Sequence, residues 1–260
     1  MKNQSSFDIN ADEYSKNSEI QLTLADKLLE NYSFRETGKV LDIGCGDGRI
    51  TSDIAKKLPR GTVTGVDASK NMIDYAKKHY PKNFFPNLDF VLGKAENLSF
   101  SKKYDHIISF NCFHWVRPWK KTLKLFHDTL NPKGEILILT YPKESPYYQP
   151  FKAASQYFPE YLDRAACATM FTALELENAL RELWMTIETF ESYNSTISYE
   201  DSTAMKDFTR IWLTSYIPLP EDQQEEFLDI LVEKTIPYRI DKGDGKIHLP
   251  YTALFVKAIK

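Results

Sequence analysis

Between residues 38 and 140, short apolar segments rich in β-branched residues alternate with single segments of helical periodicity. Apolar runs of this kind are typical of strands that are buried on both faces, as in a parallel sheet. A helix between successive strands is the crossover that parallel pairing requires. We therefore predict an α/β fold with a doubly wound, mostly parallel sheet. The predicted strands are GKVLDIG, TVTGVD, LDFVLG, YDHIISF and EILILT, the helices are DGRITSDIAKKLP, SKNMIDYAKKHYP and WKKTLKLFHDTL, and NPKG is a turn before the fifth strand.

The chain on either side of this region has a different character. Ile20, Leu24 and Leu28 recur at helical spacing, which predicts an amphipathic helix before the sheet. After residue 140, a stretch rich in proline and tyrosine leads into helical patterns at 141–182 and 199–240. Two more strands are predicted, MTIETFESYNSTI and YTALFVKAI. We expect a single domain over residues 1–260, with the core at 38–140 and helical insertions after it.

Charge and cysteine usage exclude several classes of partner. Lys and Arg total 33 against 36 Asp and Glu, a formal net charge of −3, so nothing favours binding to nucleic acid or to anionic lipid. No apolar run approaches the roughly 18–20 residues of a membrane span, and the first residues lack the apolar core of a signal peptide. Cys45, Cys112 and Cys167 are isolated, which indicates neither a disulfide framework nor a metal site. We expect a cytoplasmic protein with no metal.

The segment KVLDIGCGDGRI places three glycines directly after the first predicted strand. Ligands of open α/β sheets bind at the carboxyl ends of the strands, and glycine there lets a ligand approach the main chain. A dinucleotide site would have G-x-G-x-x-G, but Arg49 stands where the third glycine is required. The spacing is instead Asp42-x-Gly44-x-Gly46-x-Gly48. This pattern disfavours a nicotinamide-dependent dehydrogenase.

The glycine pattern resembles motif I of the class I S-adenosylmethionine-dependent methyltransferases. Asp67 ends the second predicted strand, 21 residues after Gly46, where an acid accepts hydrogen bonds from both ribose hydroxyls of that cofactor. VDASKNMI resembles the family segment in which Met72 packs near the adenine. GKAENLSF resembles the adenine loop, although Lys94 replaces the Asp that is usual there. The resemblance implies a Rossmann-like sheet of seven strands, with the last strand antiparallel.

The same resemblance implies a set of residues that bind S-adenosylmethionine. Asp42 lies near the ammonium group of the cofactor in this family, and the end of the fourth strand contacts its methionine part through main-chain carbonyls. An N-terminal helical lid over residues 1–37 closes over the cofactor. The implied cofactor-binding residues are Asp42, Gly44, Cys45, Gly46, Asp67, Ala68, Met72, Ala95, Glu96, Phe110, Asn111 and Tyr14.

The string SFNCFHWV after the fourth strand resembles the juvenile hormone acid methyltransferases and, more loosely, the trans-aconitate methyltransferases. The N-terminal YSKNSEIQ and the C-terminal IHLPYTALFVKAIK share this resemblance. It implies O-methylation of the carboxylate of a small organic acid, with His114, Trp115 and Gln21 enclosing and orienting the acceptor. A carboxylate is ionised near neutral pH, so such an enzyme needs no strong base.

Other acceptors and roles stay open at this point. The opening SSFDINADEYSKNSEIQLTLADKLL also resembles the malonyl-acyl-carrier-protein methyltransferases, whose acid is carrier-bound. A hydroxyl acceptor would require His114 as a general base. A non-catalytic S-adenosylmethionine-binding module is the alternative to an enzyme. The sequence does not choose an arginine for the substrate among Arg117, Arg164, Arg210 and Arg239, and it leaves the oligomeric state open.

Two further groups of residues have competing interpretations. His106 lies inside the fourth predicted strand, which indicates a core histidine. Aromatic residues crowd the later part of the chain, where they could line an apolar substrate pocket or form the core of a helical cap. They are Tyr147, Tyr148, Phe151, Tyr157, Phe158, Tyr161, Phe171, Trp212 and Tyr216.

Overall fold

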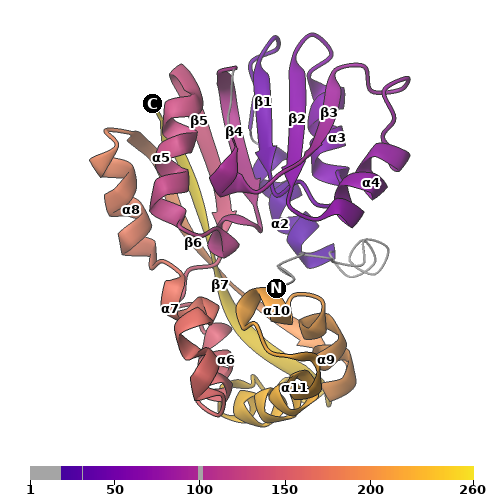
Figure 1. Ribbon diagram of the computed structural model, residues 1–260, viewed down its shortest axis with the longest axis vertical. Helices are drawn as coiled ribbons and strands as arrows, with labels where there is room; N and C mark the ends of the chain where they lie inside the picture. The colour runs from indigo at the N-terminus through magenta and orange to yellow at the C-terminus, as the bar shows by residue number, and fades with distance from the viewer. Residues whose placement is uncertain (1–18, 31, 99–101) are drawn as a thin grey trace, which may run out of the picture. The chain divides into compact units, whose positions relative to one another are not determined.

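The computed structural model describes residues 19–30, 32–98 and 102–260, without the side chains of residues 19–23 and Cys167. Seven strands form one sheet in the order β3-β2-β1-β4-β5-β7-β6 (Figure 1). The strands are β1 (Lys39–Ile43), β2 (Thr62–Asp67), β3 (Leu88–Leu92), β4 (Tyr104–Phe110), β5 (Leu130–Thr140), β6 (Thr186–Tyr199) and β7 (Ile247–Ile259). The predicted fold class is confirmed.

Helices connect the strands as the sequence pattern predicts. The α-helices are α2 (Glu19–Glu30), α3 (Arg49–Lys57), α4 (Lys70–His79), α5 (Trp119–Thr129), α6 (Tyr148–Ser155), α7 (Ala166–Thr169), α8 (Ala173–Glu182), α9 (Ser202–Arg210), α10 (Leu213–Tyr216) and α11 (Glu221–Thr235). The 3-10 helices are η1 (Ala95–Asn97), η2 (Phe113–Trp115), η3 (Pro159–Arg164) and η4 (Ile236–Tyr238). None of the described helices has both the length and the apolar character needed to cross a membrane.

The first five strands pair in parallel, and their register brings their carboxyl ends to one edge of the sheet. Ile43 pairs with Val66 across β1 and β2, and Asp67 pairs with Leu92 across β2 and β3. Helices α3, α4 and α5 pack on this sheet, so its central residues are fully buried. The apolar strand sequences follow from this burial on both faces. The last strand ends beside the start of β5, where Lys260 N–H donates to the Gly134 carbonyl at 2.9 Å, an antiparallel arrangement.

The segment NPKG differs from the prediction, because it lies inside β5 rather than in a turn before it. Tyr104 of β4 pairs with Leu130 and His106 pairs with Glu135, so a step of two residues on β4 faces a step of five on β5. The excess residues bulge out of the ladder, and Lys133 takes a positive φ of 62° there.

The chain forms two compact units. Unit 1 comprises residues 1–140, 177–191 and 255–260, and unit 2 comprises 141–176 and 192–254. The divisions between them fall after β5, within α8, within β6 and within β7. Unit 1 contains the parallel strands and the loops at their carboxyl ends. Unit 2 contains α6, α9, α10 and α11.

Candidate active site

The loop after β1 is built from glycine because its backbone requires it. Gly44, Gly46 and Gly48 have φ values of 77°, 52° and 83°, a region that side chains with a Cβ rarely adopt. The loop is held against β2, since the N–H groups of Gly44 and Cys45 both donate to the Val66 carbonyl, at 2.7 and 3.0 Å. Its main chain is thereby fixed at the edge of the sheet.

Close packing is a second reason for glycine in this loop. A Cβ on Gly44 would lie 2.3 Å from Cβ and Sγ of Cys112. A Cβ on Gly48 would lie 2.7 Å from the Phe90 ring and 2.8 Å from Cβ of Ala76. The loop therefore rests on the segment after β4 on one side and on α4 and β3 on the other. The contact between Gly44 and Cys112 was not predictable from sequence spacing.

Asp67 is bound to the glycine loop through its carboxylate. Gly46 N–H donates to Oδ2 at 3.0 Å, and Ser69 N–H donates to Oδ1 at 2.8 Å. Burial raises the pKa of Asp67, while the N–H groups of Ser69, Gly46 and Ala68 counteract that rise. The carboxylate is half-buried, and each oxygen keeps a second lone pair. Two acceptor oxygens held at the edge of the sheet fit the diol of a ribose, as predicted for S-adenosylmethionine.

Asp42, the residue before the last of β1, lies deeper, at 3% exposure. Thr51 of α3 donates its hydroxyl to Oδ2 at 2.6 Å. Burial raises the pKa of Asp42 to about 7, against the hydrogen bond from Thr51 and with a contribution from the charge of Asp67. A carboxyl with this pKa gains from a nearby cation, which fits the ammonium neighbour that the family resemblance implies. The sequence did not indicate Thr51 as its partner.

The third loop of the predicted cofactor site joins the other two at the same edge. Gly93 N–H donates to the main-chain carbonyl of Asp67 at 2.9 Å, and η1 follows with Ala95 buried and Glu96 half-buried. Met72 is buried on α4, whose N-cap is Ser69. A role for these residues in binding adenine stays a prediction.

The end of β4 carries the residues predicted to face the methyl group. Phe110 is buried, and Asn111 has a φ of 57° while its N–H donates to the Leu139 carbonyl at 2.8 Å. Asn111 thus has a left-handed backbone conformation, and the chain continues into η2, which contains His114 and Trp115. Their ring centroids lie 4.6 Å apart.

His114 is buried and neutral. Its Nδ1 lies 3.4 Å from Oγ1 of Thr140, and its carbonyl accepts a hydrogen bond from Nη1 of Arg117 at 2.7 Å. Burial, with the positive charge of Arg117, lowers the pKa of His114 to about 3. A histidine with this pKa is a weak base near neutral pH. The structure thus argues against proton abstraction by His114.

Several candidate residues belong to unit 2 or to parts of the chain that the structure does not describe. Tyr14 lies outside the described residues, and Gln21 lies in α2 but its side chain is not described. Arg210 pairs with Asp207 and Glu225 in unit 2. Among the described residues, no group of His, Cys, Asp and Glu could hold a metal ion. Arg239 donates to Thr235 and to the Val232 carbonyl, and Arg164 lies 5.2 Å from the centroid of the Tyr161 ring.

The chain is similar to known methyltransferases. Residues 34–211 match a family model described as a methyltransferase domain. Juvenile hormone acid O-methyltransferase of Drosophila melanogaster is 26% identical over 255 residues, which covers 91% of this chain and 86% of the fly protein. Malonyl-[acyl-carrier protein] O-methyltransferase of Priestia megaterium is 33% identical over 138 residues, 52% of this chain and 49% of the relative, so this chain spans about half the length of that relative.

Solved structures support the fold. The YcgJ protein of Bacillus subtilis has a TM-score of 0.64 at 20% identity, covering 93% of this chain and 98% of that one. The family match covers well over half of the chain, and its range includes the glycine loop, Asp67 and the segment after β4. The chain therefore belongs to the methyltransferase domain family, as an S-adenosylmethionine-dependent enzyme with a Rossmann-like fold.

Proposed function

We propose that this enzyme transfers the methyl group to the carboxylate of a small organic acid, forming a methyl ester. The observation that carries the proposal is the loop after β4, where His114 is buried with a pKa lowered to about 3. A hydroxyl acceptor needs a base to take its proton, and this histidine is a weak one. A carboxylate needs none, because it is ionised near neutral pH. The names of the two curated relatives, both O-methyltransferases of acids, support the same chemistry.

When bound, S-adenosylmethionine supplies an electrophilic methyl group on a positively charged sulfur. The chain then has to hold one carboxylate oxygen in line with that methyl group and exclude water from it. We assign this positioning to His114, Trp115 and Gln21, with the main chain at Phe110 and Asn111 beside the cofactor.

Arg117 is the arginine that we assign to the acceptor acid. Its guanidinium bonds the carbonyls of His114 and Val116, at 2.7 and 2.8 Å. A fixed positive charge beside His114 favours an anionic acceptor and also keeps the imidazole neutral. We expect Arg117→Gln to raise the KM for the acid by more than it lowers kcat. Arg60→Gln, at an exposed position between α3 and β2 where Arg60 pairs with Glu36, is the matched control and should leave both constants unchanged. Equal effects of the two changes would remove Arg117 from the site.

The functional division of the chain is part of the same proposal. Residues 38–140 would bind the cofactor, 1–37 would form a lid, and 141–260 would supply the remaining strands and the helical substrate cap of a single methyltransferase domain. The charge balance and the composition favour a free small acid in the cytoplasm over nucleic acid or a membrane as partner. A carrier-bound acid, the acceptor that the Priestia relative is named for, is the competing acceptor.

The decisive experiment follows labelled methyl from S-adenosylmethionine into a panel of fatty, terpenoid, tricarboxylic and carrier-bound acids. Label in an ester is released by mild base, so base-labile product is expected. With the acid and the cofactor both saturating, kcat should be independent of pH between about 6 and 9, because neither His114 nor the carboxylate of the acceptor titrates there. Base-stable label on every acceptor would refute carboxylate methylation. Cofactor binding with no transfer to any acid would favour a non-catalytic module.

A further inference from the structure

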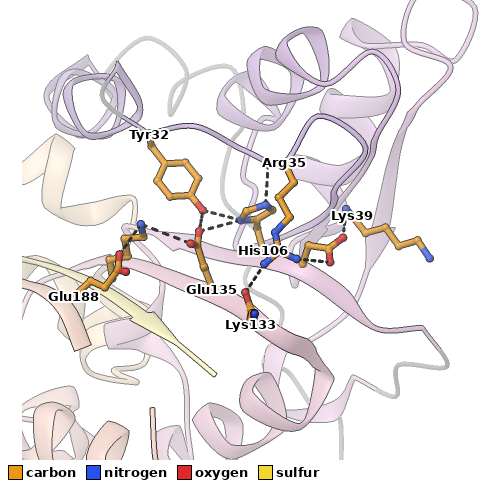
Figure 2. Close-up of polar contacts among 9 residues, drawn as sticks. Tyr32, Arg35, Lys39, His106, Lys133, Glu135 and Glu188 are labelled. Carbon is orange, nitrogen blue, oxygen red and sulfur yellow. Dashed lines mark hydrogen bonds and ion pairs between the residues drawn. The ribbon is translucent and has the colours of Figure 1, made fainter. Parts of the chain in front are cut away.

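A buried polar network lies at the amino ends of the central strands, at the opposite edge of the sheet from the glycine loop. His106 of β4 is 1% exposed and pairs in register with Val40 of β1 and Glu135 of β5. Figure 2 shows the His106 ring between Tyr32 and Arg35, with Glu135 beside it. Tyr32 and Arg35 belong to the segment between α2 and β1. The network therefore joins that segment to the base of the sheet.

The hydrogen bonds of this network have only one consistent direction. Arg35 N–H, a backbone donor, points to Nε2 of His106 at 3.2 Å, so Nε2 must accept. The ring proton of the neutral imidazole is then on Nδ1, which lies 2.6 Å from the Tyr32 hydroxyl oxygen and donates to it. The hydroxyl in turn donates to Oε2 of Glu135. Each donor of this network meets an acceptor when His106 is neutral.

Charged groups from several strands surround this network. Arg35 pairs with Asp105 at 3.4 Å, and Nη2 of Arg35 also donates to the Lys133 carbonyl at 2.5 Å. Lys257 of β7 lies 3.6 Å from Glu135, 2.8 Å from Glu188 of β6, and over the Tyr32 ring. Burial and the charge of Arg35 disfavour the imidazolium form of His106, whereas Glu135 and Asp105 favour it. The net effect lowers the pKa of His106, with burial the largest cause.

Protonation of His106 would break this arrangement at one identifiable bond. A proton on Nε2 faces the N–H of Arg35, so two donors oppose each other and the bond is lost. The imidazolium would instead pair with Glu135, whose Oε2 lies 3.3 Å from Nδ1. Tyr32 would then no longer bridge the two groups. The segment after α2 therefore has one bonded state with neutral His106 and a different one with the imidazolium.

Helix α2 connects the bond between Arg35 and His106 to the cofactor site. Among the described side chains of α2, those of Ala25 and Leu29 are buried, and α2 packs against α3. Helix α3 begins at Arg49, directly after Gly48, and its Thr51 bonds Asp42. We propose that neutral His106 is a positioning residue for cofactor binding. Through its hydrogen bonds with Tyr32 and Arg35 it holds α2 against α3. Protonation of His106 loosens α2 and thereby weakens the binding of S-adenosylmethionine. The inference rests on the proposed cofactor site but not on the identity of the acceptor.

The test compares His106→Gln with the wild type, using the whole chain and S-adenosylhomocysteine as the probe. The amide oxygen of Gln can accept from Arg35 N–H and does not titrate. His127→Gln is the matched control. His127 lies on α5 in the same unit, and the described hydrogen bond of its ring is to the neighbouring Asp128. The dissociation constant is measured by calorimetry from about pH 8 to about pH 4.5, a window that extends below the ordinary pKa of histidine because the pKa of His106 is lowered. Hydrogen exchange of α2 is followed over the same window, corrected for the intrinsic exchange rate.

We expect the wild type and His127→Gln to lose affinity several-fold, and α2 to lose protection, as the pH falls. His106→Gln should show a much smaller change in both. Titration of Asp42 and Asp67 contributes equally to all three proteins, so the difference between variants isolates His106. Tyr32→Phe supplies a second test: it lets the imidazolium pair directly with Glu135, so loosening of α2 should begin at a higher pH.

Equal pH dependence in His106→Gln and the wild type would overturn the inference. The inference would also be overturned if the hydrogen-exchange protection of α2 in the wild type stayed constant while the affinity for S-adenosylhomocysteine fell. Both readouts are independent of methyl transfer, so a failure of carboxylate methylation would leave them interpretable. Conversely, the loss of the His106 effect would leave the proposed reaction untouched.

Discussion

At the scale of single residues, Asp67 is the side chain on which the cofactor assignment depends most. Its two oxygens accept from Gly46 and Ser69 and face the same edge as the glycine loop. We expect Asp67→Ala to weaken binding of S-adenosylhomocysteine by about 1.5–3 kcal/mol, the range for hydrogen bonds to a charged group. Calorimetric titration measures it, with the exposed Asp74→Ala of α4 as control. Unchanged affinity in Asp67→Ala would show that the ribose binds elsewhere.

Asp42 makes a separate prediction about stability and pH. Its pKa is about 7 in the folded chain and about 3.9 in an unfolded one, so the folded state binds more protons between these values. By linkage, the contribution of Asp42 to the free energy of unfolding falls as the pH rises through that window. Asn at this position can still accept from Thr51 and carries no charge. Asp42→Asn should therefore gain stability relative to wild type between about pH 5 and about pH 8.

Denaturant unfolding without cofactor, at several pH values, measures this difference. Asp53→Asn is the control, because Asp53 is half-exposed and pairs only with Lys56 among its described contacts. A difference between Asp42→Asn and wild type that stays constant with pH would mean that Asp42 titrates in its ordinary range.

The sequence predicts the residues of this site better than their partners. Gly44 and Asp67 were identified because they follow apolar strands at a recognisable spacing, a local property of the chain. The contact of Cys112 with Gly44, the bond from Thr51 to Asp42 and the bond from Tyr32 to His106 join residues that are brought together only by the fold. No periodicity in the sequence records such pairs. His106 was predicted as a core histidine, and its burial confirms that, but its partners were not foreseeable.

At the scale of elements, the glycine loop and a distant glycine turn can be compared directly. Gly44 has a φ of 77° and no room for a Cβ, whereas Gly243 has a φ of 72° and nothing within 4 Å. Gly243→Ala should cost only the backbone strain, about 1–2 kcal/mol. Gly44→Ala should cost more and also abolish binding of S-adenosylhomocysteine, because the loop must move away from Cys112. Equal losses of stability in the two variants would show that the contact with Cys112 relaxes freely.

Strand boundaries show where elements escape sequence prediction. The strands with uninterrupted apolar runs lie where the sequence predicts them. NPKG carries the residues of a turn, yet it lies within β5. Pairing of Leu130 with Tyr104 and of Glu135 with His106 holds the strand on both sides of the excess residues. Long-range pairing with β4 thus overrides the local turn preference, and only the sheet reveals this.

At the scale of the whole molecule, the residues assigned to the cofactor and the aromatic cluster belong to different units. Tyr147, Tyr148, Phe151, Trp212 and Tyr216 pack on one another in unit 2, and Phe151 and Tyr216 are fully buried. The Phe151 ring centroid lies 5.0 Å from that of Trp212 and 5.1 Å from that of Tyr216. These rings form a core, which was one of the two interpretations of the aromatic sequence.

Phe151→Ala tests how far that core is separate from cofactor binding. Removing a buried phenylalanine should lower the free energy of unfolding by about 3–5 kcal/mol, since it leaves a cavity among the surrounding rings. The described residues assigned to the cofactor all belong to unit 1, so the affinity of the folded protein for S-adenosylhomocysteine should stay within about twofold, a difference below 1 kcal/mol. Tyr157→Ala, at a half-exposed position of unit 2, should change neither quantity appreciably. Loss of affinity in Phe151→Ala under conditions where the protein is fully folded would show that the aromatic core takes part in forming the cofactor site.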